Sequence, residues 1–510
     1  MQIRSRPIAG AANALALALL TLLSACADPP TATPSISPAV VTAVTPSTEL
    51  KVTQGFRKMV TLAGVRAHLE ELQAIADASG GSAGIGGAGA IATEQYVFDR
   101  LQAAGFAVQF APYDFVYNDD RTAPILQRIS PNPLVFANGV DFMSMSYSGN
   151  GDATAVVQQV DLTIPSTGTT TSGCDAADFA GFIPGRIALV QRGFCPFAQK
   201  SQNAQAAGAV GVIIMNEGNT PERLGLLGGT LLEGSGVTIP VVGTTYAVGL
   251  ELSNLTIAGD QVVRLRVDRV VEGRVARNVV AESDVGDPNR VVLVGAPMTN
   301  SDGGPGIVES SGAAALLDIA EAYAFSERTP RNRLRFVWFS GGTQGANAYA
   351  SALPTEAVGR IAMMLSFEAL GAPNFARLVY DGDQSTFSGS PTNPPGSGAI
   401  EQSLLDYFTS SALAVGAEAM PSNASPSLAF TGRGIPAGGL TTGTTQLKTA
   451  EQASLFGGTA GAALNPCYNL ACDTMNNLSD TALDQMSDAA AHATLIFSRR
   501  NFTKAPLVTP

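Results

Sequence analysis

Apolar runs typical of buried strands alternate with helical patterns in the second half of this chain, and this alternation constrains its fold most. The strand-like runs and the helical pattern occupy residues 278–281, 290–294, 313–324 (helical), 334–339 and 361–365. Strands that alternate with helices form mostly parallel sheets. The sequence therefore predicts an α/β fold with a doubly wound, mostly parallel sheet. Functional sites in such sheets lie at the carboxyl ends of strands, here after Val294, Phe339 and Leu365.

The stretch over residues 124–274 has a different character. A buried strand, a helix and a second strand follow one another there, at residues 186–190, 197–207 and 210–215. Short β-like runs surround this unit, which is typical of a small domain with its own core. We therefore expect a β-rich α+β domain over 124–274, inserted between two parts of the larger α/β domain, 51–123 and 275–503.

The N-terminus carries the features of an export signal. Residues 1–25 combine basic Arg4 and Arg6 with a short apolar stretch, and they end at Cys26 in Leu-Ser-Ala-Cys, which resembles the lipobox of bacterial lipoproteins. We expect lipidation of Cys26, with cleavage by an ordinary signal peptidase as the alternative. Residues 26–50, rich in Pro, Thr and Ser, are expected to form a flexible tether.

These features predict an exported chain that contacts the membrane through its N-terminal lipid only. The residue after Cys26 is Ala27 and not the aspartate that retains lipoproteins at an inner membrane. If the cell has two membranes, the outer one is therefore favoured.

Four cysteines remain after Cys26, and an even number in an exported chain favours disulfides. Cys467 and Cys472 are close enough in sequence to pair locally, which suggests Cys174–Cys195 as the second bridge. A metal site is disfavoured because the spacings do not match zinc knuckles and no histidine is near.

Charge and histidine content exclude several functions. The net charge of −12 argues against nucleic acid as a partner, because phosphate backbones bind basic surfaces. The chain has two histidines, whereas most hydrolytic zinc sites need two or three and most serine hydrolases need one as base. We expect His68 to be a packed or surface residue of a helix over residues 60–78, and His492 a surface residue of a helix over 490–497.

Several segments resemble the exported dinuclear-zinc aminopeptidases of bacteria, metallopeptidase family 28 of clan MH. They are Val-Leu-Val-Gly-Ala at 292–296, Gly-Pro-Gly-Ile at 304–307, Arg-Phe-Val-Trp-Phe at 335–339, Gly-Ile-Pro-Ala-Gly-Gly-Leu at 434–440, and the cysteine-containing segment 466–474. Residues 186–217 of the inserted domain resemble the protease-associated (PA) domain. The resemblance implies removal of N-terminal residues from peptides, with two zinc ions activating a water and a glutamate taking its proton.

The residues at the positions of the family's site are mostly replaced. The resemblance places the metal ligands at Pro297, Glu309, Thr343, Glu368 and Asn469, and the general base at Gly342. Only Glu309 and Glu368 could still bind a metal. Asp302 is a further oxygen donor if these two hold a hard cation such as Ca²⁺, and Ala424 stands where the family has a substrate-binding arginine.

We therefore expect a catalytically inactive homologue, a pseudo-peptidase that binds a peptide or protein. No cofactor is expected. The alternative is an active aminopeptidase with a non-standard zinc site. A hydrolase of another class is disfavoured because no Ser–His or Cys–His pair is evident.

Overall fold

The computed structural model describes residues 48–300, 304–326, 330–387, 393–421 and 425–502. The expected signal peptide and most of the expected tether, with Cys26, lie outside these ranges, as do Asp302 and Ala424. No helix within the described ranges is long and apolar enough to cross a bilayer.

Twelve α-helices are found among the described residues. They are α1 (Thr48–Arg57), α2 (Leu62–Ala78), α3 (Ala88–Ala103), α4 (Phe197–Ala206), α5 (Tyr246–Ala258), α6 (Ser311–Phe325), α7 (Thr343–Ala352), α8 (Thr355–Val358), α9 (Ser397–Ser410), α10 (Pro426–Thr431), α11 (Ala450–Phe456) and α12 (Asp480–Arg499). The sequence analysis did not predict α1, whose start at Thr48 lies inside the expected tether.

Fourteen strands occur in the same ranges. They are β1 (Ala107–Ser130), β2 (Leu134–Val135), β3 (Phe142–Ser144), β4 (Gly151–Gln159), β5 (Ile187–Gln191), β6 (Gly211–Met215), β7 (Val241–Thr244), β8 (Val262–Glu282), β9 (Asp287–Pro297), β10 (Asn332–Phe339), β11 (Ile361–Glu368), β12 (Leu378–Asp381), β13 (Gly416–Ala419) and β14 (Ala437–Thr441).

The larger domain is built on the predicted mostly parallel sheet, in the order β13-β12-β14-β11-β9-β10-β8. Strand β9 pairs in parallel with both β10 and β11, and β11 pairs in parallel with β14. Antiparallel pairs join β12 to β14 and β8 to β10. The carboxyl ends of β9, β10 and β11 therefore meet at one edge of the sheet.

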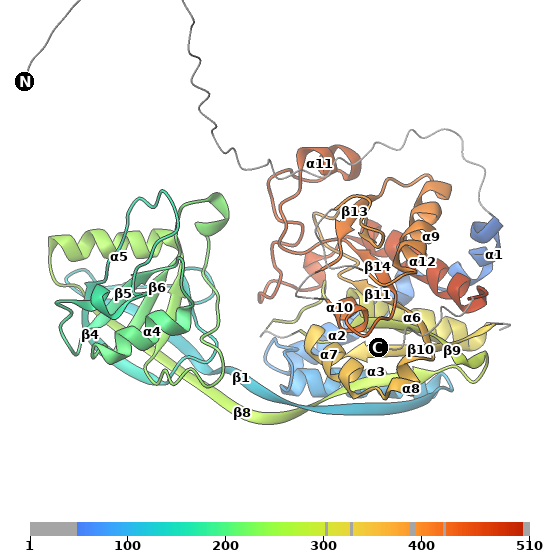
Figure 1. Ribbon diagram of the computed structural model, residues 1–510, viewed down its shortest axis with the longest axis horizontal. Coiled ribbons are helices and arrows are strands. Elements are labelled where there is room, and N and C mark those ends of the chain that lie inside the picture. Colours follow the sequence, from blue (N-terminus) through green and yellow to red (C-terminus); the bar gives the residue numbers. More distant parts are fainter. Residues whose placement is uncertain (1–47, 301–303, 327–329, 388–392, 422–424, 503–510) are drawn as a thin grey trace, which may run out of the picture. The chain divides into compact units, whose positions relative to one another are not determined.

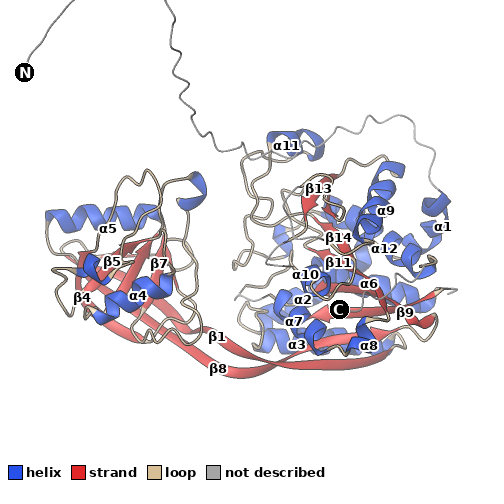
Figure 2. Ribbon diagram, in the orientation of Figure 1, coloured by secondary structure: helices blue, strands red, loops and turns tan. Residues whose placement is uncertain are grey.

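Alternating residues along these strands face two separate cores, as expected for a sheet covered on both sides. Phe336 and Trp338 of β10 pack in one core with residues of α2, α6 and α12. Val337 and Phe339 of the same strand pack in a second core with residues of α7 and α10. Helices thus cover both faces of the sheet, and the doubly wound fold is confirmed (Figure 2).

The sheet continues into the inserted domain through β8, which is followed by β4-β5-β6-β7-β3. β4, β5, β6 and β7 pair in parallel, and α4 and α5 pack on opposite faces. The long strands β1 and β8 pair over most of their lengths, from Ala107 with Glu282 to Ser130 with Val262 (Figure 1). The expected domain limits at residues 124 and 274 both fall inside these strands, whose length local patterns did not reveal.

Candidate functional site

The structure brings the predicted site positions to the carboxyl edge of the larger domain's sheet. Pro297 is the last residue of β9, and Glu368 is the last residue of β11. Gly342 caps the N-terminus of α7, which follows β10, and Thr343 begins that helix. A Cβ built on Gly342 would lie 3.8 Å from the Cβ of Pro297, so these two positions face each other.

The turn between β10 and α7 requires glycine. Gly341 and Gly342 have φ values of 67° and 55°, a backbone conformation that residues with a side chain adopt only at an energetic cost. A Cβ on Gly341 would also lie 2.3 Å from Cδ1 of Ile85. A carboxylate base at residue 342 would therefore need a different or strained backbone.

Glu309 and Asn469 lie on two loops that pack together beside this edge. The carboxylate of Asp473 accepts a hydrogen bond from the backbone N–H of Val308 (3.2 Å) and one from the backbone N–H of Glu309. The backbone N–H of Ile307 donates to the carbonyl of Asp473 (3.2 Å). Asp473, which the sequence analysis gave no role, therefore positions the turn that carries Glu309.

Asn469 lies in the short loop closed by the Cys467–Cys472 disulfide, whose Cα atoms are 5.3 Å apart. Its φ is 58°, a left-handed conformation that asparagine tolerates better than most residues. The second predicted disulfide, Cys174–Cys195, is also present, with Cα atoms 5.7 Å apart. Both expected disulfide pairings are thus confirmed.

Glu368 is engaged by hydroxyl groups. Its Oε1 accepts hydrogen bonds from Ser366 Oγ (2.5 Å) and Ser425 Oγ (2.7 Å), and the hydroxyl of Tyr380 also bonds to its carboxylate. Burial raises the pKa of Glu368 above its usual range, although these hydrogen bonds oppose the shift.

A series of hydrogen bonds links the turn after β10 to helix α3 and strand β8. The backbone N–H of Gly341 donates to Thr299 Oγ1 (2.7 Å), and Thr299 Oγ1 lies 3.3 Å from Ser340 Oγ. Ser340 Oγ donates to Glu94 Oε1 (2.7 Å), and Glu94 Oε2 accepts from Arg277 Nε (2.8 Å). These hydrogen bonds could not be predicted from local sequence patterns, because Glu94 lies on α3, far from the other residues in sequence.

Both histidines lie outside the site. His68 Nδ1 is 2.7 Å from the hydroxyl of Tyr96, and His492 Nδ1 is 2.8 Å from Thr53 Oγ1. The expectation that His492 lies on a helix surface is wrong, since its side chain is 1% exposed. The helical pattern over residues 490–497 covers only the end of α12, and His492 packs between Thr53 of α1 and Tyr407 of α9.

The described residues hold one group of three potential metal-binding side chains, and it lies elsewhere, at Asp381, Asp383 and Glu401. Backbone N–H groups bond to these carboxylates, including those of Thr386 to Asp381 (3.0 Å) and Gly382 to Glu401 (2.8 Å). The predicted ligand positions do not fit a pair of zinc ions, because each ion needs several nitrogen, thiolate or carboxylate ligands and only Glu309 and Glu368 offer one.

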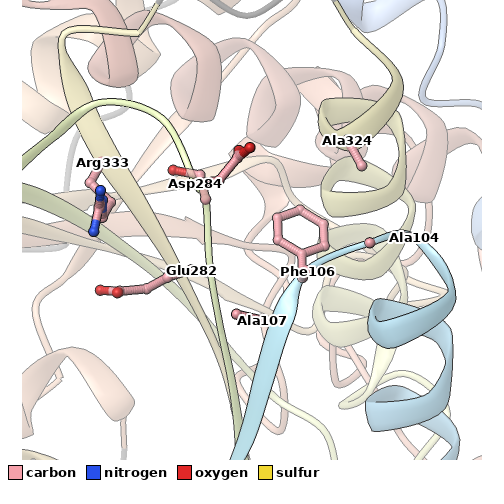
Figure 3. Close-up of a pocket in the computed structure, with 9 residues that line it drawn as sticks. Ala104, Phe106, Ala107, Glu282, Asp284, Ala324 and Arg333 are labelled. Carbon is pink, nitrogen blue, oxygen red and sulfur yellow. The ribbon is translucent and has the colours of Figure 1, made fainter.

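A pocket of about 320 Å³ lies at the opposite edge of the larger sheet. Glu282 at the end of β8 and Arg333 near the start of β10 line it, and Phe106 lies across from Arg333 (Figure 3). None of the predicted site residues lines this pocket.

Comparisons with known proteins agree with this architecture. Residues 278–494 match the model of Peptidase family M28, and residues 153–252 match the PA domain. The chain is 39% identical over 445 residues to an aminopeptidase of Pseudomonas aeruginosa strain UCBPP-PA14, covering 86% of this chain and 81% of that protein. The chain belongs to peptidase family M28.

A further relative and a solved structure are also similar to the chain. Leucine aminopeptidase 2 of Trichophyton tonsurans is 31% identical over 445 residues, covering 86% of this chain and 85% of that protein. The aminopeptidase from Aneurinibacillus sp. strain AM-1 has a TM-score of 0.62 at 22% identity, covering 89% of this chain and 98% of that one. At this identity the structural similarity shows the fold alone.

Family membership and the inserted PA domain are thus confirmed. The M28 fold brings residues 297, 342 and 368 to one edge as the resemblance implied, and the one side chain of the three that can bind a metal, Glu368, is hydrogen-bonded to Ser366 and Ser425. What the sequence analysis missed are the supporting groups Glu94 and Asp473.

Proposed function

We propose that this M28 chain is a pseudo-peptidase that binds a peptide or protein without cleaving it. The observation that carries the proposal is the chemistry of the edge where the three strands end. Proline, glycine, threonine and asparagine occupy four of the six family positions, at 297, 342, 343 and 469. None of these side chains can act as a general base or as a strong zinc ligand.

The two remaining carboxylates support the same proposal. The carboxylate of Glu368 accepts hydrogen bonds from hydroxyl groups. Glu309 belongs to the turn whose backbone N–H groups are hydrogen-bonded to the carboxylate of Asp473. Loss of a positioned general base alone lowers a rate by about 10²- to 10⁴-fold. Loss of metal ligands adds to this separately, so residual turnover is expected to be negligible.

An active aminopeptidase is the second candidate. The observation in its favour is the similarity to proteins named aminopeptidases, which reaches 39% identity over 445 residues. This candidate requires zinc to bind through a non-standard set of ligands that includes Glu309 and Glu368.

An activity assay separates the two candidates. The purified full chain is offered a panel of aminoacyl-nitroanilides with and without added Zn²⁺, beside the Pseudomonas relative as a positive control. The proposal predicts no turnover under either condition. Zinc-dependent turnover that disappears in both Glu309→Gln and Glu368→Gln would establish the active enzyme instead.

We also propose that the chain is exported and anchored to the cell envelope by a lipid on Cys26, at the outer membrane if there are two. The support is the sequence Leu-Ser-Ala-Cys after an apolar stretch. Labelled fatty acid should be incorporated into the wild-type chain and not into Cys26→Ser. Equal labelling of both would refute lipidation at this residue.

A further inference from the structure

The loops after β5 and β6 in the PA domain carry a solvent-exposed aromatic side chain and two arginines. Phe194 is 81% exposed, although phenylalanine is usually buried. Arg192 lies two residues before it, and Arg223 lies in the loop after β6. We call Arg192, Phe194 and Arg223 the arginine–phenylalanine face. It lies at the carboxyl ends of parallel strands, where α/β sheets commonly bind ligands.

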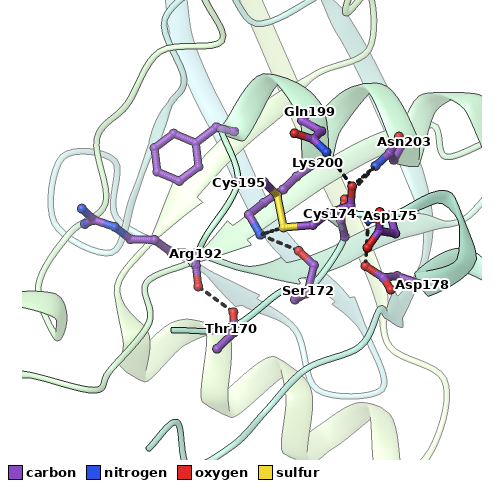
Figure 4. Close-up of a disulfide and its surroundings, with 12 residues drawn as sticks. Thr170, Ser172, Cys174, Asp175, Asp178, Arg192, Cys195, Gln199, Lys200 and Asn203 are labelled. Atoms are coloured by element: carbon purple, nitrogen blue, oxygen red, sulfur yellow. Dashed lines mark hydrogen bonds between the residues drawn. A yellow bond between two sulfur atoms is a disulfide. The ribbon is translucent and has the colours of Figure 1, made fainter. Parts of the chain in front are cut away.

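The loop that carries Phe194 is held in place from several sides. The backbone N–H of Phe194 donates to the carbonyl of Thr170 (2.9 Å), and Thr170 Oγ1 donates to the carbonyl of Arg192 (2.8 Å; Figure 4). A Cβ on Gly193 would lie 2.0 Å from the oxygen of Thr170, so this close approach requires glycine. The next residue, Cys195, is tied by its disulfide to Cys174.

These restraints make Phe194 a preorganised group. A side chain on a mobile loop loses conformational freedom when it binds, and one on a fixed loop loses less. Exposed aromatic residues on rigid supports are typical of the few side chains that carry most of the affinity of protein interfaces. The exposure of Phe194 is therefore better explained by a partner than by a loose loop.

The charges beside Phe194 favour an acidic partner. Arg223 pairs with the buried carboxylate of Glu217, which also accepts a hydrogen bond from the backbone N–H of Thr170 (3.0 Å). Within the described ranges Arg192 forms no ion pair, and its guanidinium reaches the side-chain oxygen of Asn216 at 3.5 Å. Figure 4 shows this side chain directed away from the disulfide.

The electrostatic surroundings of Arg192 also favour an acidic partner. Burial lowers the pKa of its guanidinium, nearby Arg223 lowers it further, and Glu217 opposes the shift. A carboxylate from a partner would offset both effects, and arginine binds carboxylates through two parallel hydrogen bonds.

We propose that the arginine–phenylalanine face binds an acidic segment of another protein, with a carboxylate at Arg192 and an apolar side chain against Phe194. An anionic bilayer is a poorer occupant because the chain carries a net charge of −12 and would be repelled from it. The face lies outside the degenerate peptidase site, so the proposal extends the proposed binding role and does not depend on the absence of catalysis.

The test begins with a library of random short peptides displayed on phage and selected on the purified full chain. Enriched peptides should carry Asp or Glu next to a large apolar residue. The synthetic form of the most enriched peptide is the probe. Phe194→Ala and Arg192→Gln should each weaken its binding by about tenfold or more, since truncating a dominant interface residue has such effects.

Ile257→Ala is the matched control, because Ile257 is 78% exposed on α5 of the same domain and should leave the Kd unchanged. All three variants change exposed or partly exposed side chains, and unchanged melting temperatures verify that they fold. Enrichment of peptides without acidic residues, no enrichment, or equal binding by Phe194→Ala would overturn the proposal.

Two further measurements identify other occupants. Binding to phosphatidylglycerol vesicles that is lost in Phe194→Ala would overturn the proposal in favour of a membrane. A dimer in sedimentation that is lost in Phe194→Ala would overturn it in favour of a second copy of this chain. Turnover and zinc content decide the pseudo-peptidase proposal. They are measured separately, and none of the outcomes above changes them.

Discussion

The two histidines should make this protein less stable in mild acid, by an amount that the structure allows us to calculate. His68 and His492 are 4% and 1% exposed. Burial, the largest cause, lowers the pKa of His68 to about 4 and that of His492 to about 3. Arg57 and Arg500 lower the pKa of His492 further, whereas Glu321 partly opposes the shift at His68.

The sign follows from comparing the folded and unfolded chains. Unfolded histidine has a pKa of about 6.5, so between pH 6.5 and the lowered value the unfolded chain binds a proton that the folded chain does not. The two histidines therefore leave the free energy of unfolding unchanged above pH 6.5 and lower it as the pH decreases below that value. At pH 5 the loss is roughly 1.5 pH units at 1.36 kcal/mol per unit, about 2 kcal/mol for each histidine.

Urea unfolding at pH 7.5 and pH 5 measures this loss, followed by the fluorescence of Trp338. It is the single tryptophan and lies in the same core as residues of α2 and α12, the helices that carry His68 and His492. His68→Asn and His492→Asn should each reduce the pH-dependent loss by about 2 kcal/mol relative to wild type. Titrating carboxylates are common to all three proteins and cancel. A variant that loses as much stability as wild type would show that its histidine is solvated in solution.

Two further predictions concern buried groups. Lys200 is fully buried in the PA domain, and burial lowers its pKa to about 8. Between pH 8 and pH 10 the unfolded chain therefore binds a proton that the folded chain does not, so the stability of the wild type should increase over this range. Calorimetry should show this increase in the wild type and not in Lys200→Met. Gly312→Ala would place its Cβ 2.0 Å from the oxygen of Phe367 and should cost more than about 2 kcal/mol in urea unfolding. Gly55→Ala, where nothing lies within 4 Å in helix α1, should instead stabilise by up to about 1 kcal/mol, and equal effects of the two changes would refute the packing argument.

Local patterns were sufficient to predict the α/β fold because the sheet's central strands are short and mostly apolar. The run at residues 334–339 is apolar and buried except at Arg335, which is partly exposed, so its composition marked it as a strand. By contrast, β1 was not predicted, and β8 was predicted only over short runs such as residues 278–281. Partly exposed polar residues occupy much of both strands, and their pairing over more than a hundred residues of separation is not visible locally.

The candidate site was predictable in position and not in its supporting contacts. Motif order placed residues 297, 342 and 368 correctly at strand ends, because parallel strands bring those ends together. The bonds from Ser425 to Glu368 and from Ser340 to Glu94 depend on side-chain geometry across 57 and 246 residues. His492 was misplaced because the pattern used for it covered only the end of α12 and so missed the face that packs against α1.

Zinc binding tests the central claim most directly. The purified full chain is equilibrated with Zn²⁺, dialysed, and analysed by elemental mass spectrometry together with titration calorimetry, and the Pseudomonas relative is treated in the same way. We predict no stoichiometric zinc in this chain and no saturable heat of binding. One or two zinc ions for each chain, lost in Glu309→Gln or Glu368→Gln, would contradict the account and show that this edge of the sheet still forms a metal centre.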